Sequence, residues 1–242
     1  NNPVTANFTV TPVANDCQGE ARSFSITVYP TPVVDQPEDI VVCNQETVSG
    51  INFTDNAVAG NLFYWSSSNT NIGIPSQGMG NIDSFQAINP GNSAITATIT
   101  VTPKANDCAG ESKTFTITVN PTPTVSDLDD LTVCNGEQIE KFEFSGSSVA
   151  GTTYKWTNDN PNIGLSQEGT NDIPQFKAIN NGSDPITAAI EVTPLANGCE
   201  GETRNFTITV NPTPFINTPA DQTICEDNST QPINFSGNTV SN

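Results

Sequence analysis

The sequence ITATITVTPKANDCAGESKTFTITVN, residues 95–120, alternates apolar and polar side chains along two runs that are separated by a turn-rich segment. Isoleucine, alanine, valine and phenylalanine occupy every second position of these runs, and threonine occupies most positions between them. A period of two is typical of a β-strand that is buried on one face. The stretch therefore predicts a β-hairpin with a long tip, and Cys108 lies in that tip.

The same stretch recurs 91 residues later as ITAAIEVTPLANGCEGETRNFTITVN, residues 186–211 (186 − 95 = 91). Trp65 and Trp156 are separated by the same step. The six cysteines follow it in two series: Cys17, Cys108 and Cys199, and then Cys43, Cys134 and Cys225. Such a register indicates an array of one copied unit. An array typically serves reach, spacing or multivalent contact, whereas an enzyme needs a single site.

The repeat divides the sequence into four parts: the end of one unit at 1–29, full units at 30–120 and 121–211, and the start of another at 212–242. We therefore expect the sequence to be a window from a longer repetitive protein. A Pro-Thr-Pro segment marks each boundary, and two prolines spaced by one residue favour an extended, stiff backbone. These linkers predict successive units held in a line, as in a rod or stalk.

Shorter strand candidates precede each hairpin, among them DIVVC at 39–43 and NLFYW at 61–65. No window shows the 3.6-residue spacing of an amphipathic helix. Short strands between Asn, Gly, Pro and Ser turns predict an all-β fold of tandem immunoglobulin-like antiparallel β-sandwiches in an extended array. Trp65 and Trp156 each follow an aromatic residue in a central strand, where such a sandwich keeps its core tryptophan.

The net charge is −19, from 26 acidic residues against 7 Lys and Arg, and the acids are spread along the chain. This composition argues against nucleic acid and anionic lipid as partners, because both need clusters of Lys and Arg. No stretch approaches the ~20 apolar residues of a membrane helix, so we expect no membrane insertion of this segment. Histidine is absent, which removes Ser-His and Cys-His nucleophile systems. We predict no catalytic residues and no enzyme activity.

Two cysteines at fixed places in each unit predict disulfide bonds and an extracellular location. Three pairings respect the repeat. The favoured one is within a unit, Cys43–Cys108 and Cys134–Cys199, with Cys17 and Cys225 paired outside the sequence. The others run across a boundary (Cys17–Cys43, Cys108–Cys134, Cys199–Cys225) or join Cys43 to Cys199 in neighbouring units. The favoured pairing requires the long tip to fold back, since the first strand of a simple sandwich ends at the pole opposite the last hairpin tip.

One acidic cluster is a candidate metal site. Asp127, Asp129 and Asp130 follow directly after a linker, and carboxylates at a domain boundary can chelate Ca²⁺ and rigidify an array. The alternative is a solvated acidic face. We expect no cofactor other than this calcium.

The motifs YKW at 154–156, NPNIGL at 160–165 and NGC at 197–199 carry a family resemblance that covers the whole chain. The unit resembles the PKD-like and immunoglobulin-like repeats of very large secreted surface proteins in Bacteroidota, including gliding-motility adhesins exported by the type IX secretion system. The resemblance implies a β-sandwich, a cell-surface location and a role in adhesion or motility. It brings no catalytic residues.

Together, the repeat and the resemblance predict a structural or adhesive region that forms a stiff stalk or filament on the cell surface. Its expected partners are neighbouring repeats of the same chain, together with surface glycans or other cells. The alternative is a set of carbohydrate-binding accessory repeats in a secreted polysaccharide-degrading enzyme.

Overall fold

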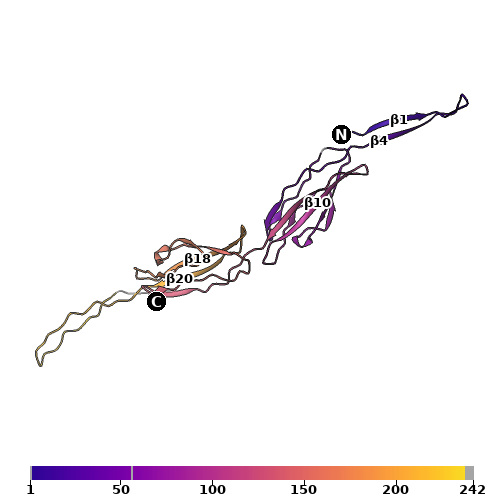
Figure 1. Cartoon of the computed structure of the whole chain (residues 1–242). Coiled ribbons are helices and arrows are strands. Elements are labelled where there is room, and N and C mark those ends of the chain that lie inside the picture. The colour runs from indigo at the N-terminus through magenta and orange to yellow at the C-terminus, as the bar shows by residue number, and fades with distance from the viewer. Residues whose placement is uncertain (1, 56, 238–242) are drawn as a thin grey trace. The chain divides into compact units, whose positions relative to one another are not determined.

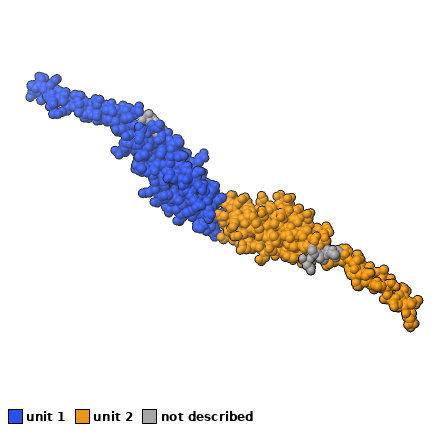
Figure 2. All heavy atoms as spheres, turned by 180° about the vertical axis from the view of Figure 1, so that it is seen from behind, with its two compact units in different colours: residues 1–121 blue, residues 122–242 orange. Residues whose placement is uncertain are grey.

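The computed structural model describes residues 2–55 and 57–237. By its internal contacts the chain divides into two compact units, Asn1–Pro121 (unit 1) and Thr122–Asn242 (unit 2), which Figure 2 distinguishes by colour. The four-part division made from the repeat stays a prediction. Within the described residues, no helix has the length and apolar character that a membrane span requires.

Unit 1 is built around one six-stranded sheet. Its strands follow the order β5 (Ile40–Cys43), β12 (Lys113–Asn120), β10 (Ile95–Ala105), β7 (Leu62–Ser67) and β8 (Gln77–Met79), and β11 (Cys108–Ala109) pairs with β10. β10 and β12 form the hairpin that the alternation predicts, with Ile99 opposite Phe115. The long β10 runs through the middle of this unit in Figure 1.

Unit 2 repeats this sheet strand for strand. The order is β13 (Leu131–Cys134), β20 (Arg204–Asn211), β18 (Ile186–Ala196), β15 (Thr153–Asn158) and β16 (Glu168–Thr170), with β19 (Cys199–Glu200) on β18. β18 and β20 are the second copy of the hairpin, and Figure 1 labels both.

A second, smaller layer closes each sandwich. In unit 1 it holds the pair β6 (Thr47–Val48) and β9 (Phe85–Gln86), with isolated bridges Val34–Asp55 and Ile51–Ile82. In unit 2 it holds β14 (Gln138–Ile139) and β17 (Phe176–Lys177), with the bridge Phe142–Ile173. One turn of 3₁₀-helix follows β7 and β15, at Thr70–Ile72 (η1) and Pro161–Ile163 (η2). The predicted fold class is confirmed.

One pairing in each sheet differs from the antiparallel rule. β5 pairs in parallel with β12, so that Ile40 lies opposite Ile117 and Cys43 opposite Asn120. β13 and β20 pair in the same way. Parallel neighbours require a long connection, and here the rest of the unit supplies it. The first strand of each six-stranded sheet thus lies beside the last of its long strands, β12 or β20.

The core is formed by the apolar face of the hairpin together with one tryptophan. Ile99, Ile117 and their equivalents in unit 2 have no exposed surface, and Trp156 is 2% exposed. The indole lies flat on the neighbouring strand, where a Cβ on Gly169 would overlap its ring. Trp65 and Gly78 repeat this contact, so the predicted core role of both tryptophans is confirmed.

A buried asparagine fixes the loop before β10 and before β18. Asn180 is 3% exposed, and its Nδ2 donates to the carbonyl oxygens of Asp184 (2.8 Å) and Val210 (2.7 Å). Its Oδ1 accepts from the Gly182 N–H at 2.9 Å. Asn89 makes the same three kinds of bond in unit 1. The loop is therefore tied to the last strand by a side chain whose polar atoms are satisfied.

The parts that flank the sandwiches are simpler. β1 (Val4–Val10) and β4 (Arg22–Val28) form an antiparallel hairpin, seen side by side in Figure 1, with β2 (Val13–Ala14) and β3 (Cys17–Gln18) at its tip. Its residues are exposed throughout, and Phe8 stacks on Phe24 with the ring centroids 5.1 Å apart.

We predict that Asn180→Ala lowers the free energy of unfolding of unit 2 by at least about 2 kcal/mol, because buried backbone groups lose their partners. In a Trp65→Phe background, Trp156 is the single tryptophan and reports urea unfolding of unit 2 alone. The matched control is Asn181→Ala, which changes an exposed neighbour and should stay within about 0.5 kcal/mol. Equal effects of the two changes would contradict the assignment.

Candidate functional site

Each sandwich has two ends that carry the features singled out in the sequence. We call the end at the foot of the main hairpin the base end; in unit 1 it holds Cys43, Asn44 and Asn120. We call the opposite end the tip end; in unit 1 it holds the hairpin tip with Cys108 and Gly110. In unit 2 the base end holds Cys134, Asn135 and Asn211, and the tip end holds Cys199 and Gly201.

The base end is held by a short network of asparagines. The backbone N–H of Asn44 donates to the carbonyl oxygen of Asn120 at 2.8 Å, which continues the β5–β12 ladder past Cys43. The side chain of Asn44 accepts from the backbone N–H of Asn89 at 2.7 Å. Asn135, Asn180 and Asn211 repeat both bonds in unit 2. These residues were not predicted from the sequence, although asparagine occurs at each of the positions in both repeats.

The tip end packs against the linker that leads into the same unit. A Cβ on Gly110 would overlap the carbonyl oxygen of Pro32, and a Cβ on Gly201 would overlap that of Pro123. Glycine is therefore required at both positions, because only a residue without a side chain lets the two backbones approach this closely.

The expected within-unit disulfides Cys43–Cys108 and Cys134–Cys199 are not formed. Cys17, Cys108, Cys134 and Cys225 are free, whereas Cys43 and Cys199 are disulfide-bonded. Cys108 pairs with Ala105, the last residue of β10. Cys43 pairs with Asn120 of β12, which lies one residue beyond the partner of Ile95, the first residue of β10. The 11 residues of β10 keep the two apart by ~30 Å, and a disulfide requires Cα atoms within about 7 Å.

The three acids proposed to hold calcium do not converge. Asp130 Oδ1 accepts from the backbone N–H of Thr207 at 2.7 Å, and Asp127 lies 3.6 Å from the Arg204 guanidinium. Asp129 is exposed. Across residues 2–55 and 57–237, no three acidic or cysteine side chains come together as metal ligands would. Asp39 accepts a hydrogen bond from the backbone N–H of Thr116 in unit 1, as Asp130 does from that of Thr207 in unit 2. This structural hydrogen bond explains why the acid occurs in both repeats.

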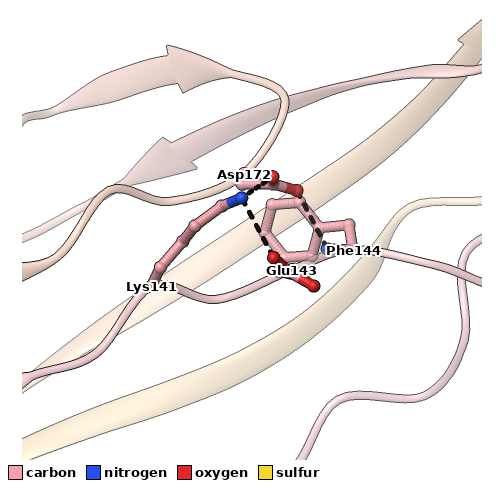
Figure 3. Close-up of polar contacts among 4 residues, drawn as sticks. All are labelled: Lys141, Glu143, Phe144 and Asp172. Atoms are coloured by element: carbon pink, nitrogen blue, oxygen red, sulfur yellow. Dashed lines mark hydrogen bonds and ion pairs between the residues drawn. The ribbon is translucent and has the colours of Figure 1, made fainter.

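The ionic cluster around Lys141 is one feature that differs between the two units. Lys141 Nζ lies 2.8 Å from Asp172 Oδ2 and 3.0 Å from Glu143 Oε1, as Figure 3 shows. The hydrogen bond to Asp172, and then that to Glu143, raises the pKa of Lys141. The hydrogen bond from Lys141 lowers the pKa of Asp172; burial opposes this shift, and the hydrogen bond from the backbone N–H of Phe144 adds to it. Both groups therefore stay charged over the neutral range.

This cluster consists of ion pairs between charged groups. Forming an amide from Lys141 and Asp172 would require a neutral amine and a protonated acid, and both pKa shifts run the other way. In unit 1 the positions equivalent to Glu143 and Asp172 hold Asn52 and Asn81, which share a neutral hydrogen bond of 2.8 Å. The same two segments are thus joined by different chemistry in the two copies.

The hollows on the described surface are open to solvent. The largest that we describe in unit 2, about 670 Å³, lies over β15 and β16 and is lined in part by Tyr154, Lys155, Glu168 and Leu195. A nucleophile paired with a histidine base cannot occur, because the sequence contains no histidine.

Comparison with known proteins agrees with this architecture. Residues 40–123 and 131–214 each match the family described as the PKD-like domain, which together is more than half of the chain. No curated protein matches the chain.

Solved structures with similarity are tandem immunoglobulin domains. Titin domains I67–I69, in an E-to-A mutated variant, match at 11% identity and a TM-score of 0.46 over 85% of this chain and 74% of that one. Titin domains A168–A170 match at 11% identity and a TM-score of 0.39, over 84% and 73%. Sidekick-1 immunoglobulin domains 1–5 match at 14% identity and a TM-score of 0.31, over 86% and 46%.

We predict that Asp130→Ala lowers the free energy of unfolding of unit 2 by about 1 kcal/mol, the typical net value of one hydrogen bond. The loss should be the same in EDTA and in millimolar CaCl₂, since Asp130 acts through Thr207. Asp129→Ala is the control and should be neutral. A calcium-dependent rise in the unfolding midpoint that either change abolishes would restore the metal site.

We predict that Lys141→Met lowers the unfolding midpoint of unit 2 at neutral pH. The lowered pKa of Asp172 contributes stability above its unfolded value, 3.8, and this contribution is lost as the pH falls through the still lower folded value. The raised pKa of Lys141 contributes stability below 10.5 that is lost as the pH rises through the folded value.

The difference between the two proteins should therefore be present at neutral pH and vanish at both extremes. Urea titrations over this range test the prediction, with Lys155→Met as an exposed control outside the cluster. A pH-independent difference would mean that Lys141 acts only through the packing of its aliphatic chain.

Proposed function

The chain belongs to the PKD-like domain family, and on that premise we propose that it is the structural or adhesive repeat region of a large secreted bacterial surface protein. The tandem would form part of a stiff stalk or filament on the cell surface. The resemblance to the gliding-motility adhesins of Bacteroidota supports adhesion or gliding as its task and type IX secretion as its route.

One observation carries this proposal: the two copies keep the bonds that hold the sandwich and its ends. Three contacts recur in both units: a tryptophan ring packed on a glycine, a buried asparagine with three hydrogen bonds, and an aspartate that accepts a hydrogen bond from the last strand. The two units therefore present equivalent ends to their linkers. This is what an array requires if each added copy is to extend it in the same way.

The surfaces of the two units, in contrast, do not match. The Lys141 cluster has a neutral counterpart in Asn52 and Asn81, and Glu191 on the outer face of β18 stands where Thr100 stands on β10. A binding or catalytic role carried by every copy would require the same exposed groups in each. The surface variation thus favours a spacer that tolerates change over a repeated ligand site.

The carbohydrate-binding alternative has little support in the aromatic residues. Both tryptophans are buried and cannot serve as flat platforms for sugars. Tyr64 is 41% exposed, but its ring faces the Lys104 ammonium, 5.0 Å from the ring centroid.

The test is to measure the length of the protein against its number of repeats. We expect that a second copy of residues 121–211, inserted after Asn211, lengthens the particle by a constant increment in electron micrographs and in small-angle X-ray scattering. Replacing Pro121 and Pro123 by glycine should shorten the mean end-to-end distance without changing the far-ultraviolet circular dichroism, because glycine removes the stiffness of the linker.

The competing function predicts different results. A compact particle whose length does not grow with repeat number would contradict a stalk. Binding to a glycan array that is lost in Tyr64→Ala, with the β-sheet signal unchanged, would support the carbohydrate-binding role instead.

A further inference from the structure

The hairpin of β1 and β4 is a further copy of the hairpin that ends each repeat. Phe24 and Ile26 of β4 occupy the positions of Phe115 and Ile117 of β12 (115 − 91 = 24). In unit 1 this apolar face is buried, since Phe115 is 2% exposed and Ile117 has no exposed surface. Phe24 and Ile26 are 53% and 51% exposed. A contiguous apolar face that is open to solvent is typical of an interaction surface.

Residues 212–237, which we call the opening segment, are a further copy of the start of a repeat. The bridge between Ile216 and Gly237 repeats the bridge between Val34 and Asp55 in unit 1 (216 − 34 = 182, two repeats). Val34 is 1% exposed, whereas Ile216 is 61% exposed. The opening segment thus has the backbone pairing of the start of a sandwich, with its apolar side chains on the surface.

Unit 1 shows how such a segment and such a hairpin fit together. Phe53 packs edge-on against Phe115, with the ring centroids 6.4 Å apart. The equivalent of Phe53 in the opening segment is Phe235 (53 + 182 = 235), which is 71% exposed, and the equivalent of Phe115 is Phe24. The chain therefore carries both members of this aromatic pair on two separate exposed surfaces.

The outer edge of β4 is open to a further strand. Among the strands that the structure describes, β4 pairs with β1 alone, whereas the equivalent β12 lies between β10 and the parallel β5. An open edge is a template for pairing with another chain. The register of β5 on β12 places residues 222–225 beside residues 26–29 (40 + 182 = 222; 117 − 91 = 26).

An aspartate before the incoming strand has its partner on that edge. Asp39 in unit 1 accepts a hydrogen bond of 2.6 Å from the backbone N–H of Thr116. The equivalent of Asp39 is the exposed Asp221 (39 + 182 = 221), and the equivalent of Thr116 is Ser25 of β4 (116 − 91 = 25). The same hydrogen bond can therefore form when the strand is added.

The tip of the hairpin carries the glycine that this contact requires. A Cβ on Gly110 would meet both Pro103 of its hairpin and the carbonyl oxygen of Pro32, whereas the nearest atoms to a Cβ on Gly19 all belong to Pro12 of its own hairpin. The equivalent of Pro32 in the opening segment is Pro214 (32 + 182 = 214). Gly19 thus leaves room for the backbone of Pro214 to approach.

We propose that the opening segment of one molecule docks on the β1–β4 hairpin of a second copy of this chain and joins the copies head to tail. Because each molecule carries one opening segment and one hairpin, the contact is heterologous and assembly continues beyond a dimer. It forms between two molecules and requires no particular placement of the units within one. The inference goes beyond the proposed function and does not depend on adhesion.

The first experiment is sedimentation velocity of the full chain from micromolar to millimolar concentration. Cys17, Cys134 and Cys225 are replaced by serine in all proteins, because exposed thiols crosslink copies on their own. We expect the weight-average mass to rise with concentration above that of the monomer. A monomer at every concentration would overturn the proposal.

Two blocking variants test which surfaces meet. Phe24→Asp blocks the hairpin and Phe235→Asp blocks the opening segment, so each alone should weaken association at least about tenfold, as the loss of an aromatic anchor does. A mixture of the two keeps one intact hairpin and one intact opening segment, and it should form a 1:1 dimer and nothing larger. Thr9→Asp puts the same charge on the opposite face of the hairpin and should change nothing.

Hydrogen exchange locates the added strand. The backbone N–H of Ser25 should gain protection as the concentration rises, and Asp221→Ala should remove this gain. Self-association of the Phe24→Asp protein equal to that of the parent, or an equal loss in Thr9→Asp, would overturn the proposal. Protection of Ser25 that does not depend on concentration would also overturn it, because the opening segment would then dock on the hairpin of its own molecule.

Discussion

The parallel pairing of β5 with β12, and of β13 with β20, is the contact on which the rest of each sandwich depends. It brings Cys43 beside Asn120 and Cys134 beside Asn211, so the first and last strands of a sandwich share one edge of its main sheet. The asparagine network then closes around this edge, with Asn89 or Asn180 tying the preceding loop to the last strand. The position where the chain leaves the unit is thereby fixed relative to the core.

Much of this fold follows from periodicity in the sequence. The alternation in residues 95–120 predicted the hairpin and its buried face, and the 91-residue step predicted that a second copy would share its bonds. Trp65 and Trp156 were placed in the core by their position in a central strand, and they lie there. The local pattern was sufficient in these cases because a strand that is buried on one face alternates apolar and polar side chains, whichever strands lie beside it.

What the sequence did not reveal depends on contacts between distant segments. DIVVC reads as a strand, but its parallel partner lies some 77 residues away, and no local signal shows which edge it joins (117 − 40 = 77). The same contact rules out a disulfide between Cys43 and Cys108, since it places the two cysteines at opposite ends of the sandwich. The acids at 127–130 were predicted as metal ligands because they are close in sequence. In an extended backbone, however, neighbouring side chains point in different directions. Asp130 instead accepts a hydrogen bond from the backbone of the last strand.

The order of strands also determines how a unit resists being pulled. A force applied between the two linkers of unit 1 draws β5 toward the start of the unit and β12 toward its end. Because these strands are parallel neighbours, the force slides one along the other, and the four residue pairs of their ladder are loaded together. A hairpin pulled open from its foot would instead lose its bonds one after another. The arrangement that positions the ends of each sandwich therefore also makes shear the mode in which the unit bears tension.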